Sequence, residues 1–87
     1  MTIETPETRE GAHGLLRRLS RTADADVLLP LARYLANGGH VHWRAAALAH
    51  QMDAEAFEDQ NDRDLLAAIR CSLANGDDSG LRYLLNM

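Results

Sequence analysis

The sequence contains no lysine, and all nine of its permanently basic residues are arginines. Its single cysteine, Cys71, cannot form an internal disulfide, so the cytoplasm is the expected compartment. No apolar run approaches the roughly 18 residues that a membrane span needs. The polar and acidic beginning, MTIETPETRE, is unlike a signal or transit peptide. We therefore expect a cytoplasmic protein without a membrane partner.

Apolar β-branched residues are scarce, since Val27, Val41 and Ile69 are the only ones after Ala23. Alanine and leucine dominate instead, which favours helices over strands. Apolar residues make up 46% of the 87 residues, enough for a modest core but not for a deep cleft between domains. The composition predicts one all-α domain over residues 1–87, with residues 1–5 flexible.

Apolar spacing and helix-breaking residues divide the chain into a small bundle of five or six short helices. The first helix begins near Pro6, because proline suits the first turn. The third helix, residues 41–52, is apolar nearly all round and is therefore predicted to be central and buried. The apolar residues of the first helix fall at i, i+3, i+4 and i+7 and form one stripe: Ala12, Leu15, Leu16 and Leu19.

The second half of the chain contains three further helical segments. Asp53 is expected to cap a short turn, AEAFED. Asn61 and Asp64 resemble a capping box for a helix over residues 62–74. The last helix, LRYLLNM, is expected to be capped by Ser79 or by the aspartate before it.

Two segments resemble each other at matching positions, DVLLPLARYLANG (26–38) and DLLAAIRCSLANG (64–76). Each ends in Asn-Gly, which is typical of a helix C-terminus because glycine readily takes the left-handed conformation. Each copy therefore predicts a helix, a corner and a second helix. Two such hairpins would stack, with the N-terminal helix across them. The likeness fits either an internal duplication or chance similarity between alanine- and leucine-rich helices.

The stretch ANGGHVHWR holds two histidines and the only tryptophan. A metal site would combine His40 and His42 with His50 or Cys71. Metal ligands on a helix are spaced three or four residues apart, however, and the recognisable zinc spacings are absent. We therefore expect no metal and no other cofactor, and interpret the stretch as a corner between helices. Cys71, between alanines, is interpreted as a small buried filler.

Charge is unevenly distributed, with a net +1 over residues 1–44 and −5 over residues 45–87. Arg17, Arg18 and Arg21 form either an anion patch or a solvated helix end that complements the helix dipole. The overall charge of −4 argues against general affinity for nucleic acids.

The strongest charge feature is a run of acidic residues on both sides of Phe57, the only phenylalanine. One interpretation is a solvated linker with helix caps. The other is an acidic face that docks on a basic partner. Phe57 is then either a buried plug between the two hairpins or, if exposed, the anchor of that face. The acidic residues are Asp53, Glu55, Glu58, Asp59, Asp62 and Asp64.

No phosphate-binding loop and no nucleophile motif is evident, so we expect no enzymatic activity. The sequence favours a small protein-interaction module or adaptor whose partner carries a basic surface. One alternative is an acidic inhibitor of a nucleic-acid-binding complex, of the kind that phages and other mobile elements encode. A second is a helix-turn-helix-like DNA-binding regulator, although the third helix is too alanine-rich and apolar for an exposed reading helix.

Overall fold

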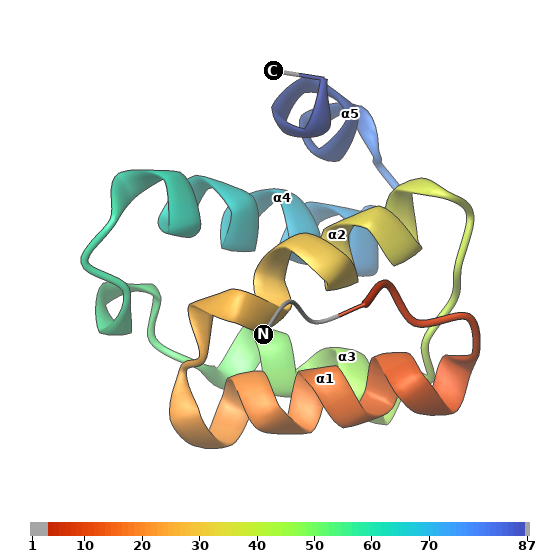
Figure 1. The fold of residues 1–87 in the computed structure, drawn as a ribbon, viewed down its shortest axis with the longest axis horizontal. Coiled ribbons are helices and arrows are strands. Elements are labelled where there is room, and N and C mark those ends of the chain that lie inside the picture. Colours follow the sequence, from red (N-terminus) through yellow and green to blue (C-terminus); the bar gives the residue numbers. More distant parts are fainter. Residues whose placement is uncertain (1–3, 87) are drawn as a thin grey trace.

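The computed structural model describes residues 4–86, and within them the chain forms only helices and connecting turns (Figure 1). The predicted all-α bundle is confirmed. Of the residues expected to be flexible, 1–3 lie outside the described part, and residues 4 and 5 precede the first helix. The elements are α1 (Arg9–Thr22), the 3-10 turn η1 (Ala25–Val27), α2 (Leu28–Ala36), α3 (Trp43–Gln51), the 3-10 turn η2 (Ala54–Ala56), α4 (Gln60–Asn75) and α5 (Ser79–Leu85).

Helix α1 begins at Arg9, three residues later than the expected start at Pro6. The reason is that Thr8 caps the helix: its Oγ1 atom accepts the Gly11 N–H at 3.2 Å. The predicted apolar stripe is confirmed by the complete burial of three of its members, Ala12, Leu16 and Leu19.

Helix α2, rather than α3, lies at the centre of the bundle. It packs against α1, α4 and α5, whereas α3 packs mainly against α1 and α4. Only Ala49 of α3 is buried, so the prediction of a central third helix was wrong. Alanine is the strongest helix former, and its abundance in α3 reflects helix propensity rather than burial. The buried residues of α2 are Leu28, Pro30, Leu31, Ala32 and Leu35.

The two predicted Asn-Gly corners are confirmed. Gly38, after α2, has a φ of +88°, and Gly76, after α4, has a φ of +69°. Both glycines therefore adopt the left-handed conformation that ends a helix. After the first corner, the Tyr34 hydroxyl donates a hydrogen bond of 2.7 Å to the His40 carbonyl. This bond holds the connection to α3 against the end of α2.

The packing of the helices differs in one respect from the two stacked hairpins that the sequence predicts. Helices α4 and α5 pack against each other as expected, but residues 37–42 carry the chain away from α2, and α3 lies against α1 (Figure 1). The two halves of the apparent repeat, α2 and α4, pack on each other instead. Two pairs of equivalent apolar positions are fully buried: Leu28 and Leu66, Leu31 and Ile69.

The start of α4 is set by Asp59, whose carboxylate accepts the Asn61 N–H at 2.8 Å. The helix therefore begins at Gln60, and the predicted capping box of Asn61 and Asp64 was wrong. Asp64 instead accepts a hydrogen bond of 2.8 Å from the Gln60 side chain. The predicted cap of η2 is confirmed, because the Asp53 carboxylate accepts the backbone N–H of the second residue after it.

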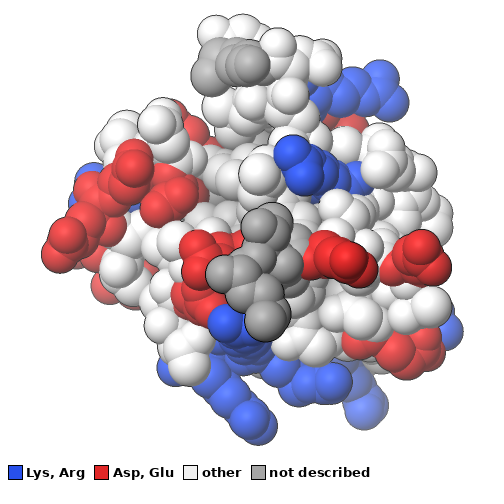
Figure 2. Space-filling model, in the orientation of Figure 1, with Lys and Arg blue, Asp and Glu red and all other residues white. Residues whose placement is uncertain are grey.

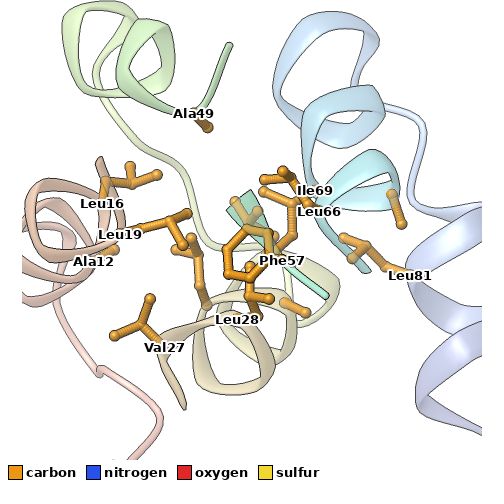
Figure 3. Close-up of a cluster of buried hydrophobic side chains, with 14 residues drawn as sticks. Ala12, Leu16, Leu19, Val27, Leu28, Ala49, Phe57, Leu66, Ile69 and Leu81 are labelled. Carbon is orange, nitrogen blue, oxygen red and sulfur yellow. The ribbon is translucent and has the colours of Figure 1, made fainter. Parts of the chain in front are cut away.

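Phe57 points into the core between η2 and α4. Its side chain is 3% exposed, and Figure 3 shows the ring directed into the buried cluster. The Phe57 carbonyl accepts a hydrogen bond of 2.7 Å from Arg63 Nε, which fixes the turn around it. Phe57 is therefore the plug of the bundle, and the alternative of an exposed anchor was wrong.

Candidate functional site

The predicted acidic residues divide into helix caps and exposed side chains. Asp53 and Asp59 accept backbone N–H groups at the starts of η2 and α4. Glu55, Glu58 and Asp64 are exposed. Figure 2 shows acidic side chains gathered on the left of the molecule, where η2 and the start of α4 lie. The fold therefore accounts for the two caps, and the exposed acids remain for solvent or a partner.

Asp62 belongs to a small concentration of carboxylates drawn from two elements. Its pKa is raised above the ordinary 3.8 by partial burial and by the negative charges of Asp59 and Asp26. Asp26 lies in η1 and was not among the predicted site residues, because it is distant from Asp62 in the sequence. We call Asp26, Asp59 and Asp62 the acidic surface.

The three arginines predicted as an anion patch have different surroundings along α1. Arg18 Nε lies 2.6 Å from a carboxylate oxygen of Asp24, the one ion pair within residues 4–86. Arg21 lies in the last turn of α1, where a positive charge complements the helix dipole. Arg17 instead lines a pocket together with residues of α3. In Figure 2 arginine side chains gather along the lower edge, where α1 runs.

A cationic pocket of about 270 Å³ lies between α1 and the start of α3. Two of its residues, His13 and Arg17, are one helical turn apart on α1. His42 and Arg44, at the start of α3, complete the polar lining, and Ala45 and Leu48 complete the apolar part. No carboxylate lines it. The spacing of His13 and Arg17 was the only sequence signal for this pocket, because His42 follows 29 positions after His13.

Backbone hydrogen bonds hold both histidines of the cationic pocket. His13 Nε2 accepts the His42 N–H at 3.0 Å, and His42 Nδ1 accepts the Arg44 N–H at 3.1 Å. The second bond caps α3. These acceptors carry no hydrogen, so in the neutral rings the hydrogens are assigned to His13 Nδ1 and His42 Nε2. Each ring therefore keeps one N–H that is free to donate to another group.

A groove of about 420 Å³ lies between α3 and the end of α4, and Trp43 is among its lining residues. We call it the Trp43 groove. Its lining includes the apolar side chains of Leu35, Val41 and Leu73, and also His50. Trp43 is 70% exposed. The Arg44 guanidinium lies over its indole, 5.2 Å from the ring centroid, a distance at which a cation is attracted to the ring.

Other expectations about single residues are changed by the structure. Cys71 is exposed, so its interpretation as a buried filler was wrong. His40, His42 and His50 are exposed as well, and no group of three metal-ligating side chains is found within the described residues. The interpretation of α3 as too apolar to be an exposed helix was wrong, because Ala49 is its only buried residue.

Comparisons with protein-family models, with curated proteins and with solved structures found no match to this chain. Among the helices of residues 4–86, none combines the length and the apolar character required to cross a membrane. The function is therefore inferred from the acidic surface, the cationic pocket and the Trp43 groove.

Proposed function

We propose that this chain is a non-catalytic protein-interaction module, and that it docks a partner protein on the Trp43 groove. The observation that carries the proposal is the 70% exposure of Trp43 at the edge of a partly apolar groove. Tryptophan is enriched among the residues that dominate binding energy, because it buries a large apolar area and keeps one polar group.

The lining of the groove suits an apolar side chain from the partner. Leu35, Val41 and Leu73 offer apolar contacts, while His40 and His50 offer polar atoms. Burying an apolar side chain among such residues contributes about 1.5–3 kcal/mol, so one or two anchors would support a specific complex. The acidic surface is formed by residues other than those of the groove. It favours a partner with basic residues, because opposite charges accelerate the association of two proteins.

The test compares two aromatic residues of equal exposure. Trp43 and Tyr83 are each 70% exposed, but only Trp43 lines the groove. A partner is first captured from an extract of the producing cells, and its affinity for the purified wild type is then measured by calorimetry. We expect Trp43→Ala to weaken binding by about thirtyfold or more, the effect of losing about 2 kcal/mol at a binding hot spot. Tyr83→Ala should bind as the wild type does.

Unchanged affinity in Trp43→Ala, with its helix content intact by circular dichroism, would rule out the groove as the docking site. Equal losses in the two variants would show instead that general surface hydrophobicity drives the association.

A second candidate function, an acidic inhibitor of a nucleic-acid-binding complex, is favoured by the acidic surface. Asp59 caps α4 and Asp62 lies in its first turn, so two negative charges stand at the start of this helix. The captured partner should then bind duplex DNA, and the chain should compete with that DNA. In Asp59→Asn/Asp62→Asn this competition should weaken, while the asparagine at position 59 still caps α4. A partner without affinity for nucleic acid would reject this candidate.

The DNA-binding alternative is tested with the chain alone. Because the net charge is −4, we expect no affinity for bulk duplex DNA at physiological salt. Affinity that falls steeply as salt rises would instead support the regulator.

A further inference from the structure

We propose that the cationic pocket between α1 and α3 binds a phosphoryl group, either as free phosphate or as the terminus of a small phosphate monoester. The inference is independent of the proposed docking function, because it rests on a different cavity. His13, Arg17, His42 and Arg44 line the pocket, whereas Trp43 lines the groove.

The hydrogen-bond donors that line the pocket indicate that its ligand carries a negative charge. Arg17 and Arg44 contribute two guanidinium groups, which carry only donors. Neither is paired with a carboxylate within residues 4–86, since the one ion pair there involves Arg18. The two histidines use their acceptor nitrogens for backbone N–H groups and keep one N–H each. The polar side chains of the pocket therefore have donors left over and no carboxylate to accept from them.

The number of donors favours a phosphoryl group over a carboxylate. A carboxylate carries one negative charge on two oxygens and can be satisfied by a single guanidinium. Two guanidinium groups and two imidazole N–H groups match a dianion with three terminal oxygens. The helix N-terminus is not the basis of this match, because the Arg44 N–H is already bonded to His42.

Part of the pocket is held in place before any ligand arrives. The His42 backbone is tied to His13, so the start of α3 is fixed against α1. The Arg44 guanidinium lies over the Trp43 indole, which restricts its side-chain rotamers. Ala45 and Leu48 form an apolar side of the pocket. Preorganised donors lose less conformational entropy on binding.

The experiment is a titration followed in amide and arginine side-chain NMR spectra at pH 7 and constant ionic strength. Inorganic phosphate and O-phosphoserine are the two probes, and sodium chloride is the reference. We expect saturable shifts at Arg17, His42 and Arg44 with the phosphoryl probes, and none with chloride. Tighter binding of phosphoserine would assign the pocket to monoesters. Equal or tighter binding of inorganic phosphate would assign it to the free ion.

A charge-matched pair of variants tests the named residues. Arg17→Gln/Arg44→Gln removes both guanidinium groups of the pocket and should weaken phosphate binding by about tenfold or more, the effect of losing at least one charge-assisted hydrogen bond. Arg33→Gln/Arg82→Gln changes the net charge equally at two exposed residues that do not line the pocket and should bind as the wild type does.

Two results would overturn the proposal. One is the absence of saturable shifts with both phosphoryl probes. The other is equal phosphate affinity in the two double variants, which would show that only the overall charge attracts the anion. Because neither measurement involves a protein partner and neither variant changes Trp43, failure here leaves the proposed docking function untouched.

Discussion

Arg70 of α4 donates from its Nε atom to the backbone carbonyl of Ala49 near the end of α3, at 2.8 Å. Its Nη2 atom donates to the carbonyl of Met52. The last carbonyls of a helix have no partners within the helix, and they carry the negative end of its dipole. One half-buried guanidinium therefore joins α4 to the end of α3.

This contact predicts that Arg70→Met lowers the free energy of unfolding by about 1–3 kcal/mol. Methionine preserves most of the apolar stem but leaves the two carbonyls without their donor. Urea denaturation monitored by circular dichroism measures the loss. Arg82→Met, which removes an exposed arginine of α5, should change stability by less than about 0.5 kcal/mol. Equal effects in the two variants would argue against the Arg70 contacts.

The burial of Phe57 predicts that Phe57→Ala lowers the free energy of unfolding by about 3–5 kcal/mol, because it leaves a cavity in the core. Phe57→Leu should recover part of this loss by refilling some of the volume. Tyr83→Ala, at a side chain that is 70% exposed, serves as the control and should be nearly neutral. A Phe57→Ala variant as stable as this control would contradict the placement of Phe57 as the plug.

Alanine substitutions should destabilise the fold at two glycines and stabilise it at a third. Gly38 and Gly76 have positive φ values, so Gly38→Ala and Gly76→Ala should each cost about 1 kcal/mol. Gly14 lies within α1, and a Cβ atom there meets nothing within 4 Å. Gly14→Ala should therefore stabilise the fold by about 0.5–1 kcal/mol. Thermal melting of the three variants gives the signs, and stabilisation at either corner would refute the left-handed conformation there.

The parts of the fold that follow from short-range chemistry could be predicted from the sequence. Gly38 and Gly76 ended their helices because the left-handed conformation is a local property of glycine. The stripe of α1 followed from helical spacing alone. The edge position of α3 could not be predicted, because alanine promotes a helix whether or not the helix is buried. Which face Cys71 occupies likewise depends on how α4 packs.

The candidate sites were less predictable, because they form between elements distant in sequence. His13 was not singled out, since only the packing of α1 on α3 brings it to the His42 N–H. Similarly, the charge of Asp26 in η1 acts on Asp62 of α4, which lies 36 positions later in the sequence. The charge of a local run, such as the acids around Phe57, was visible from the sequence. Its division into caps and exposed side chains required the structure.

The acidic surface makes a prediction about the titration of Asp62. Its pKa is raised chiefly by burial and then by the charges of Asp59 and Asp26. Asp59→Asn removes one of these charges and retains a side chain that caps α4, so the pKa of Asp62 should fall. Carboxyl carbon shifts followed during an acid titration measure this change. An unchanged Asp62 pKa in the variant would mean that Asp59 does not act on it.

The start of α5 makes the opposite prediction for Asp77. Its carboxylate accepts hydrogen bonds from the hydroxyl and the backbone N–H of Ser79, and these bonds lower its pKa below the ordinary 3.8. Ser79→Ala removes the hydroxyl and leaves the N–H, so the pKa of Asp77 should rise part of the way back. The same NMR titration measures it.

The direction of the Asp77 pKa shift determines how the stability of the protein depends on pH. A carboxyl whose pKa is lowered by folding stabilises the native state above its unfolded pKa, and this stabilisation is lost as the pH falls through the lowered value. In the wild type, the bonds at the start of α5 should therefore persist to below pH 3.8. In Ser79→Ala, Asp77 should become protonated at a higher pH, and the α5 amide signals should change over the same interval. If the α5 signals of both proteins changed at the same pH, the Ser79 hydroxyl would have no part in holding the Asp77 carboxylate.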